Sequence, residues 1–459
     1  MSHGSGEAAL LAGRVKRHNS ALFAILHQAG WLAAAVQVEF FRAREWRLRP
    51  NRTDVVYRGR RRTDGTARGA IISPVEYLFL AIAAIPFIYY LIAIFSVLKF
   101  FGQAPRAIGR KPDFTPPISN LKPVRGLDPE AYENFASFCR QDYPEFELLF
   151  CVHDRHDPSV PVLEQLIRDF PGCKIRILYG SGRVAINDKV AKLVRLVQEA
   201  RHEVLVINDS DVRVQPDYFR TVVAPLQDPI VGGVTCMYLS VHDATVTQNL
   251  QSVGMISDFY PGIIVAWLLD GVKFAFGQTI VTTRTLLAGF GGFEALESRP
   301  ADDLLTGRLI AEQGVEVKLL PYTVQTVADY QCLRGLLIKR LRWMTVMRHM
   351  RPWGHAGLVF THGLAWSLVA VAVHPTPAVA ALYLGTYVTL RLAMTILVGR
   401  WGLKEKHLWR KLPLFVIWDL TAFFIWLTSF VRRSIRWRGI DYFVRAGMLV
   451  PGRTALKSK

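Results

Sequence analysis

Long apolar stretches on both sides of a central region most constrain the fold of this 459-residue chain. A helix needs about 20 predominantly apolar residues to cross the hydrocarbon core of a membrane. Four stretches approach or exceed that length: Val75–Leu98, Leu358–Val373, Ala378–Val398 and Leu412–Val431. We therefore expect an integral membrane protein with a water-facing domain between the first stretch and the other three.

Polar residues and prolines within these stretches predict further details of the helices. Pro86 should kink the first helix without breaking it. Asp419 should face protein or water, because a lone carboxylate at membrane depth is costly, and its stretch could be re-entrant instead of spanning. A shorter run in the central region, Phe259–Leu269, is too short to span and predicts a core helix or a surface resting on the membrane.

Composition divides the chain into five parts. They are a basic appendage at 1–73 that is interfacial or flexible, a transmembrane helix at 74–101, a domain at 102–354, a membrane region of two or three helices at 355–431, and a basic tail at 432–459.

The central part alternates strand-like and helix-like patterns. Apolar runs rich in β-branched residues are separated by helical patterns such as Val160–Phe170 and Lys189–Ala200, which predicts an α/β fold with a mostly parallel sheet. Ligands of such sheets bind beyond the carboxyl ends of the strands. No GxGxxG follows a predicted strand, which argues against a dinucleotide oxidoreductase. The predicted strands are Phe146–Val152, Ile175–Tyr179, Val204–Ile207, Ile230–Met237 and Val315–Leu319.

The formal net charge of +19 is compatible with either nucleic acid or an anionic membrane surface as a partner. Three of the four Lys and Arg clusters adjoin apolar stretches, which favours the membrane. Neither a zinc-finger spacing nor a nucleic-acid module is recognisable. We expect no nucleic-acid partner and predict no specific protein partner.

Asp209-Ser210-Asp211 directly follows a predicted strand. Two carboxylates at i and i+2 can point to one side of the sheet edge, where they would hold a divalent cation against a diphosphate. The same triplet is typical of an Asx turn. We expect Asp209 and Asp211 to be metal ligands, with Mg²⁺ or Mn²⁺ as the ion.

Two residues earlier in the domain are candidates for contact with a nucleotide. Asp154 follows another predicted strand and could accept from a uracil N–H or a ribose hydroxyl, or form part of an exposed turn. Lys189 begins a helix and could reach a phosphate or the base, although an exposed lysine in the first turn of a helix is the default interpretation.

Asp302 and Asp303 precede a helical pattern, where negative charge stabilises a helix N-terminus by itself. A sugar transfer with inversion also needs a carboxylate to take the proton from the attacking hydroxyl. We favour Asp303 as that base and Asp302 as a cap or a supporting residue.

Lys339-x-x-Arg342-Trp343 lies in a basic helical stretch. Arg342 could hold a diphosphate through paired hydrogen bonds, and Trp343 could form a wall of the acceptor or sugar pocket. An amphipathic helix on anionic lipid is the alternative, and we expect Arg340, Arg348 and Arg351 to have only that role.

These motifs, in this order, resemble the ceramide glucosyltransferases, a branch of the inverting glycosyltransferases with the GT-A (Rossmann-like) fold. The resemblance spans about residues 75–440. It includes Leu121–Pro129, Asp142–Pro144, Leu149–Asp154, Asp157-Pro158, Arg183–Asn187 with Lys189, Asp209–Val214, Ala301–Asp303 and Arg342-Trp343.

The resemblance implies transfer of a sugar from a UDP-sugar to a lipid hydroxyl, most like UDP-glucose to ceramide. The family's three aspartate sites fall on Asp154, Asp209 and Asp303. Its (Q/R)xxRW motif begins here with Lys339, which keeps the charge but loses forked hydrogen bonding. A bacterial sister group that adds N-acetylglucosamine to hopanoid lipids is similar throughout, so a hopanoid acceptor is the alternative.

Two other functions are compatible with parts of this pattern. A processive polysaccharide synthase carries similar aspartates, but it needs enough spanning helices for a channel. A membrane-anchored binding protein with an inactive transferase domain is the second. We expect a bacterial inner membrane protein with residues 102–354 in the cytoplasm, where UDP-sugars are found.

Overall fold

The computed structural model describes residues 73–103, 114–183, 185–327, 332–432, 434–437, 440–445 and 448–451. The chain divides into two units, Met1–Ile71 and Ile72–Lys459. The predicted appendage at 1–73 therefore lies outside the described residues, except for Ser73.

An eight-stranded sheet forms the centre of the second unit, in the order β3-β2-β1-β4-β7-β6-β8-β5. β5 and β7 run antiparallel to their neighbours, and the other six strands share one direction. The predicted α/β class with a mostly parallel sheet is confirmed. The strands are β1 (Ile118–Pro123), β2 (Phe146–Val152), β3 (Lys174–Tyr179), β4 (Val204–Ile207), β5 (Val212–Arg213), β6 (Val231–Ser240), β7 (Ile280–Thr283) and β8 (Glu316–Thr326).

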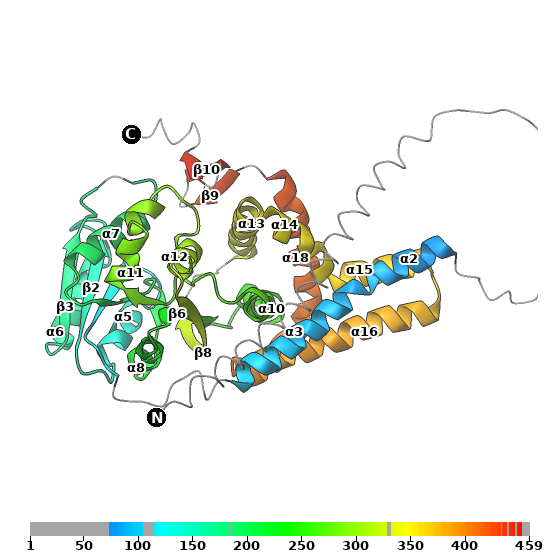
Figure 1. Ribbon diagram of the computed structural model, residues 1–459, viewed down its shortest axis with the longest axis horizontal. Helices are drawn as coiled ribbons and strands as arrows, with labels where there is room; N and C mark the ends of the chain where they lie inside the picture. The colour runs from blue at the N-terminus through cyan, green and yellow to red at the C-terminus, as the bar shows by residue number, and fades with distance from the viewer. Residues whose placement is uncertain are drawn as a thin grey trace, which may run out of the picture. The chain divides into compact units, whose positions relative to one another are not determined.

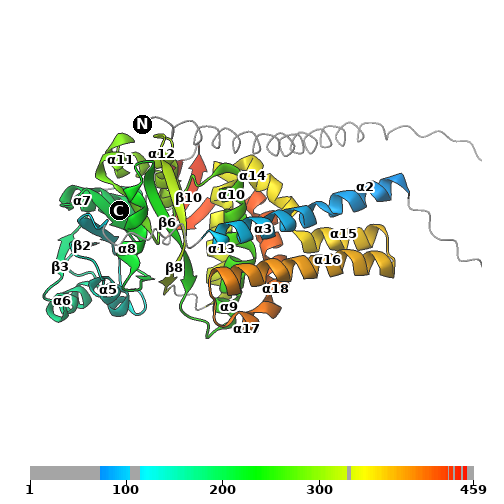
Figure 2. The same ribbon diagram turned by 60° about the horizontal axis from the view of Figure 1, so that its bottom comes forward.

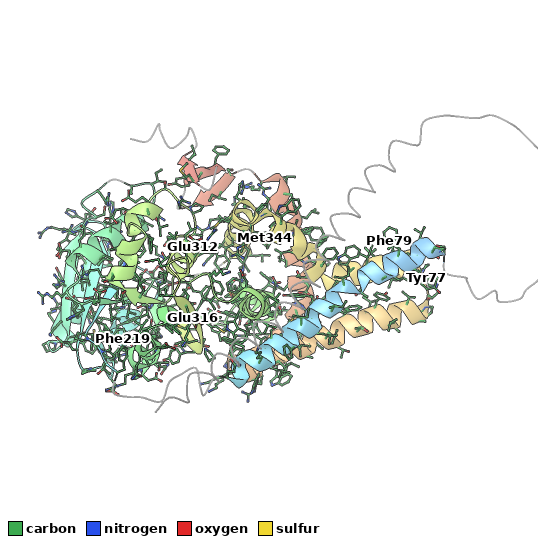
Figure 3. All side chains as sticks on the ribbon, in the orientation of Figure 1. Tyr77, Phe79, Phe219, Glu312, Glu316 and Met344 are labelled. Carbon is green, nitrogen blue, oxygen red and sulfur yellow. The ribbon has the colours of Figure 1, made fainter. Side chains whose placement is uncertain are left out.

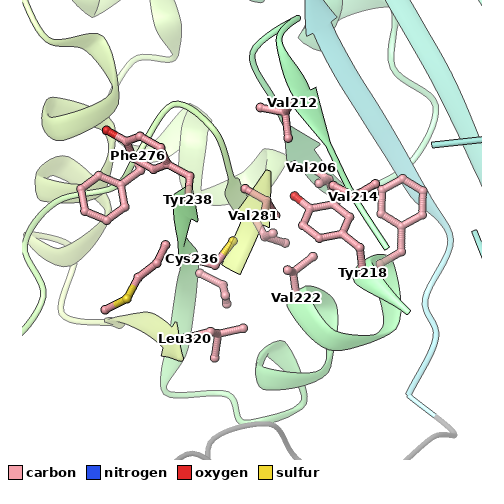
Figure 4. Close-up of a cluster of buried hydrophobic side chains, with 14 of the residues drawn as sticks. Val206, Val212, Val214, Tyr218, Val222, Cys236, Tyr238, Phe276, Val281 and Leu320 are labelled. Atoms are coloured by element: carbon pink, nitrogen blue, oxygen red, sulfur yellow. The ribbon is translucent and has the colours of Figure 1, made fainter. Parts of the chain in front are cut away.

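Helices cover both faces of the sheet because side chains alternate along each strand. In β2, Leu148 and Phe150 face a core shared with α5, α6 and α8, whereas Leu149 faces a core shared with α7, α11 and α12. Figure 4 shows the part of the first core around Tyr218, Cys236 and Val281. These helices are α5 (Ala131–Cys139), α6 (Val160–Asp169), α7 (Asp188–Glu199), α8 (Tyr218–Val223), η1 (Ala224–Gln227), α11 (Arg284–Gly289), η3 (Phe293–Leu296) and α12 (Asp302–Ala311).

Four helices among the described residues are long and apolar enough to cross a membrane: Pro74–Gly102, Val246–Asp270, Pro377–Gly402 and Leu408–Val431. They comprise α2 (Pro74–Ala83) and α3 (Ile85–Gly102); α9 (Val246–Gly254), the π-helical η2 (Met255–Phe259) and α10 (Tyr260–Asp270); α16 (Pro377–Ile396) and η5 (Leu397–Gly402); and α17 (Leu408–Lys411), η6 (Leu412–Leu414) and α18 (Phe415–Val431). Three of the four predicted spans are confirmed by length and composition.

Two predictions about apolar helices are confirmed only in part. The run at Phe259–Leu269 is not a short helix, because it is the second half of a helix of 25 residues that is long and apolar enough to span. Its Tyr260 and Ile264 nevertheless belong to the core of the domain, as predicted for a core helix. The predicted span Leu358–Val373 is not one straight helix, because the chain bends by 58° between Pro352–Thr361 and Gly363–Val373. This bent pair is long and apolar enough to form either a broken span or a re-entrant loop. The bent segment contains α14 (Pro352–Gly357), η4 (Leu358–Thr361) and α15 (Gly363–Val373).

The apolar helices form a bundle of their own. α3 contacts α16, α15 contacts both α2 and α16, and Figure 1 shows these four helices side by side. Figure 2 shows α9 beside α18, which it contacts. On α3, Ile88, Leu91 and Phe95 share one side of the helix and are each more than half exposed, as lipid-facing residues are. Tyr77, near the start of α2, projects outward in Figure 3 and is 59% exposed.

The part of the chain predicted only as a basic tail contains a three-stranded antiparallel sheet, in the order β11-β10-β9. Ile435 and Tyr442 of this sheet pack against Val346 of helix α13. The bounds are α13 (Leu333–Met350), β9 (Ser434–Trp437), β10 (Ile440–Arg445) and β11 (Met448–Pro451).

Candidate active site

The carboxyl ends of neighbouring strands place two of the predicted aspartates on one edge of the sheet. β1 pairs with both β2 and β4, and Leu121 aligns with Leu149 of β2 and with Ile207 of β4. Asp154 and Asp209 follow β2 and β4, so the strands that carry them end about 10 Å apart, with β1 between them.

Lys189 joins two acidic segments that are far apart in the sequence. Its ammonium lies 2.7 Å from Asp209 Oδ1 and 3.2 Å from Asp302 Oδ2. Burial works against the charge of this lysine, but the two carboxylates raise its pKa, so it stays protonated. Burial alone would also raise the pKa of Asp209, but the Lys189 ammonium lowers it. Lys189 therefore holds Asp209 and Asp302 together, a contact that sequence reasoning did not predict.

Gly277 connects Asp209 to Asp303 through the backbone. Its N–H donates to Asp303 Oδ2 at 3.2 Å, and its carbonyl accepts from the Asp209 N–H at 3.1 Å. A Cβ at this position would lie 2.8 Å from Asp209 Oδ2 and 3.1 Å from Lys189 Nζ. Only glycine fits here without displacing those side chains. Gly277 was not predicted, because a single glycine between Phe276 and Gln278 gives no distinctive signal.

Asp303 lies in the first turn of α12, beside Asp302. The N–H of Leu304 donates to Asp303 Oδ1 at 2.8 Å. Burial raises the pKa of Asp303 to about 6, and the neighbouring charge of Asp302 acts in the same direction. A carboxylate with a raised pKa is a stronger proton acceptor than an exposed aspartate. The residue that carries this shift is the one that the sequence predicts as a base.

Asp211 completes the acidic group. Burial raises its pKa to about 6, and the charge of Asp209 contributes. Its carbonyl accepts from the N–H of Val327 at the end of β8, which fixes the segment between β4 and β5. Two nearby carboxylates that resist ionising together are a donor set that a divalent cation would stabilise.

No group of three or more His, Cys, Asp or Glu side chains among the described residues is arranged to hold a metal ion. Mg²⁺ is commonly held by one or two carboxylates, together with phosphate oxygens and water. Asp209 and Asp211 fit that smaller donor set.

A buried lysine on β1 supports the acidic edge from inside the sheet. Lys122 is 0% exposed, and its ammonium lies 3.3 Å from the Asp209 carbonyl and 3.5 Å from the centre of the Phe138 ring. Burial lowers its pKa to about 7, against the charges of Asp209 and Asp211. Lys122 lay within the segment Leu121–Pro129 but had no predicted role.

Asp154 is not joined to this group by any contact among the described residues. Its side chain is 52% exposed, and its Oδ1 accepts from the His156 N–H at 2.7 Å. The nearby Asp157 is buried and accepts from the N–H groups of Gly126, His153 and Ser159, so it fixes the loops after β1 and β2. Asp154 is thus presented outward from a fixed loop, in a position open to a ligand.

Helix α13 brings Lys339 and Trp343 to the same region. The charge of Lys339 lowers the pKa of Asp209 and acts against the raised pKa of Asp211. Its ammonium lies 5.5 Å from the centre of the Trp343 ring, and that ring lies 5.9 Å from the ring of Phe259. Arg342 precedes Trp343 on this helix and is half-buried.

Two arginines of α13 were wrongly expected to serve only a lipid surface. Arg340 is 8% exposed, its Nε donates to Gln251 Oε1 at 3.1 Å, and its guanidinium stacks between Trp343 and Trp418. Arg348 donates to the backbone carbonyls that end α18, including that of Arg432 at 2.8 Å. Both arginines fix α13 against the apolar helices.

A cavity of about 740 Å³ lies away from these residues. Its walls include Asp228, Lys318 and Leu319, near the amino ends of β6 and β8, together with Phe100 and Trp267. None of the predicted site residues lines it. The acidic group at the opposite ends of the strands is therefore the candidate active site.

The α/β fold, the acidic edge of the sheet and the adjoining apolar helices define a membrane-associated glycosyltransferase. The profile of Glycosyl transferase family 21 matches residues 78–450. The chain belongs to that family.

Several curated relatives are ceramide glucosyltransferases. Ceramide glucosyltransferase 1 of Caenorhabditis elegans is 34% identical over 123 residues, which is 26% of each chain. Ceramide glucosyltransferase 3 of the same organism is 21% identical over 356 residues, 73% of this chain and 74% of that one. The enzyme of Komagataella phaffii is 34% identical over 143 residues, 29% of this chain and 28% of that one. The alignments at 34% identity thus cover less than a third of those relatives.

Solved structures of two other transferases resemble the chain at low sequence identity. A mannosyltransferase from Pyrobaculum calidifontis, in complex with GDP-Man and Mn²⁺, is 19% identical with a TM-score of 0.48, over 75% of this chain and 99% of that one. Glucosyl-3-phosphoglycerate synthase from Mycobacterium tuberculosis, with Mn²⁺ and UDP, is 14% identical with a TM-score of 0.33, over 51% of this chain and 78% of that one.

Proposed function

We propose that this family 21 enzyme transfers glucose from UDP-glucose to the hydroxyl of ceramide, with inversion at the anomeric carbon. The observation that carries the proposal is the position of Asp303, a half-buried carboxylate with a raised pKa. Gly277 holds it next to the Lys189–Asp209 pair. The ceramide glucosyltransferase relatives and the adjoining apolar helices support a lipid acceptor.

In the proposed reaction, the Asp303 carboxylate takes the proton of the lipid hydroxyl. The hydroxyl oxygen forms a bond to the anomeric carbon as the bond from that carbon to the diphosphate oxygen breaks, and UDP leaves. Asp154 orients the nucleoside from its outward-facing loop. Lys189, Arg342 and Trp343 hold the donor. A Mg²⁺ or Mn²⁺ ion held by Asp209 and Asp211 would offset the negative charge that develops on the departing diphosphate.

We propose that residues 102–354 lie on the cytoplasmic side, where UDP-sugars are available, in the inner membrane of a bacterium. The helix Val246–Asp270 then does not cross the membrane, because Lys189 joins Asp209, before this helix, to Asp302, after it. The basic residues around Arg400–Lys411 then also lie inside, as the positive-inside rule asks.

The test is product analysis with the full chain purified in detergent and supplied with ceramide, UDP-glucose and Mg²⁺ or Mn²⁺. Mass spectrometry should detect hexosylceramide, and a β-specific glucosidase should release its sugar. Removal of divalent cations with EDTA should stop transfer, and their return should restore it.

A parallel reaction with UDP-N-acetylglucosamine and a hopanoid polyol tests the alternative acceptor. If only that reaction gives a product, the acceptor is a hopanoid and not ceramide. A polymer would indicate a polysaccharide synthase. Absence of donor turnover with every acceptor would indicate an inactive binding protein.

A further inference from the structure

The helix at Val246–Asp270 changes partners at its π-helical turn, Met255–Phe259. Before the turn, Leu250 and Val253 pack in the apolar cluster that contains Tyr90 and Trp418 of the other helices. From the last residue of the turn onward, Phe259, Ile263 and Trp267, at i, i+4 and i+8, pack against the core of the catalytic domain. A π-helical turn adds one residue and so rotates the following face of a helix; such turns are frequent at functional sites.

Phe259 lies at the point where this face reaches the candidate active site. Its ring centre is 5.9 Å from that of Trp343 and 5.7 Å from that of Phe276. Phe276 directly precedes Gly277, whose N–H binds the carboxylate of Asp303. One aromatic contact and one peptide bond therefore connect Phe259 to the glycine that positions the proposed base.

The ring of Phe259 is not sealed in the core. Its neighbour Tyr260 is 0% exposed, whereas Phe259 and Trp343 are both half-buried. Two adjoining aromatic side chains thus keep accessible apolar surface beside a polar, acidic site. This surface is continuous with a helix that is long and apolar enough to cross a membrane.

We propose that Phe259, together with Trp343, holds the apolar part of the lipid acceptor next to the hydroxyl that Asp303 deprotonates. The inference rests on the proposed function and adds the acceptor-positioning residue. A lipid whose hydroxyl reaches the acidic edge of the sheet must leave its hydrocarbon beside that edge, and these two rings provide apolar surface there. Phe259 contacts the acceptor and not the donor, so its loss should affect the two substrates differently.

The experiment compares Phe259→Ala with the wild type in detergent micelles, with C6-ceramide as acceptor and UDP-glucose as donor. The KM for ceramide should rise about tenfold or more, as expected when a largely buried aromatic contact is lost. The KM for UDP-glucose and the slow hydrolysis of UDP-glucose without acceptor should stay within about twofold of the wild type. Phe259→Leu, which keeps an apolar side chain, should recover most of the ceramide KM.

Phe146→Ala is the matched control, because Phe146 is also a half-buried phenylalanine packed on the same core, with its ring 5.3 Å from that of Phe219. It lies at the start of β2, at the edge of the sheet opposite the aspartates of the candidate active site. Phe146→Ala should lower thermal stability without a selective change in the ceramide KM.

Two results would overturn the inference while the wild type still forms glucosylceramide. One is an unchanged ceramide KM in Phe259→Ala. The other is an equal loss for both substrates that follows thermal stability, as in the control. Failure of the wild type to glycosylate any lipid would instead overturn the proposed function, and the inference with it.

Discussion

Asp419 in the apolar bundle and Asp209 at the sheet edge each pair with a basic residue, but their surroundings differ. Asp419 accepts from Tyr387 Oη at 2.8 Å and from Arg391 Nε at 2.9 Å, and Arg391 also donates to the carbonyl of Ser257. The side chains of Arg391 and Asp419 are 5% and 7% exposed. Those of Lys189 and Asp209 are 16% and 29% exposed.

The charge balance separates the two clusters more sharply than exposure does. One arginine matches one carboxylate in the bundle, and hydrogen bonds satisfy both oxygens of Asp419. At the sheet edge Lys189 interacts with Asp209, Asp302 and Asp303, while Asp211 lies near Asp209 and Lys339. The pKa values of Asp211 and Asp303 are raised. A pair with all its hydrogen bonds made stabilises the arrangement of helices, whereas neighbouring carboxylates with raised pKa values are typical of a functional site.

Asp303→Asn should have the largest effect on activity. Loss of the proton acceptor should reduce kcat by about 10²- to 10⁴-fold, the usual contribution of a general base. Binding of UDP-glucose, measured by isothermal titration calorimetry, should stay nearly unchanged, because Asp303 is proposed to act on the acceptor. Loss of donor binding would reassign the residue.

Asp228→Asn is the matched control for this variant. Asp228 pairs with Lys318 at 3.5 Å and lines the cavity at the other ends of the strands. Its replacement should leave kcat within about twofold of the wild type, because surface ion pairs contribute little.

Asp419→Asn tests the structural half of the comparison. Removing one partner of a buried ion pair leaves an uncompensated charge and costs about 3–5 kcal/mol. The variant should melt at a clearly lower temperature in detergent, while the KM values of its folded fraction stay near those of the wild type.

The double variant Arg391→Met/Asp419→Leu should recover much of this stability, because apolar replacement of a whole buried pair is often neutral. If the Asp419→Asn variant instead keeps its melting temperature but loses turnover, the bundle pair has a functional role and the contrast with the sheet edge fails.

The sheet edge was predictable because strands with regular apolar patterns lead to it. β2 and β4 have the predicted bounds, Phe146–Val152 and Val204–Ile207. β1 was not predicted, since its sequence Ile-Ser-Asn-Leu-Lys-Pro lacks the apolar run of a buried strand. Its polar side chains are buried against partners far along the chain, such as Asn208, which accepts from Asn120 at 2.6 Å. Contacts between residues more than 80 positions apart in the sequence leave no pattern in the local sequence.

The first half of the helix at 246–270 was missed for a related reason. Its polar side chains made it look unlike a membrane segment, but they bind other helices. Gln251 accepts from Arg340, and the Ser252 hydroxyl lies 3.3 Å from Lys411 Nζ. At the site, the acidic motifs could be predicted from their places after strands and before a helix. The contacts of Lys189 and Gly277 could not, because they depend on how those segments meet.

Gly277→Ala should have a smaller effect that is confined to the sheet edge. The added methyl group would displace the ends of Asp209 and Lys189, which are flexible enough to move. We expect kcat/KM for UDP-glucose to fall about tenfold, which corresponds to about 1.4 kcal/mol. Gly385→Ala, at an exposed helical position with no atom within 4 Å of the new Cβ, should keep full activity. Equal behaviour of the two variants would mean that the close approach at Gly277 does not matter.

The pH dependence of kcat/KM should show the smallest effect. It tests most directly whether neighbouring carboxylates raise the pKa of Asp303. Because the pKa of Asp303 is raised to about 6, its carboxylate is protonated and inactive as a base below that pH. The value of kcat/KM, which reports the free enzyme, should rise as the pH increases through about 6. Asp302→Asn removes a like charge that helps to raise this pKa, so the midpoint should move to lower pH. Asp228→Asn should leave the midpoint in place. If the midpoint of the pH profile does not move in Asp302→Asn, burial alone sets the pKa of Asp303. The neighbouring carboxylates would then no longer distinguish the sheet edge from the ion pair in the bundle.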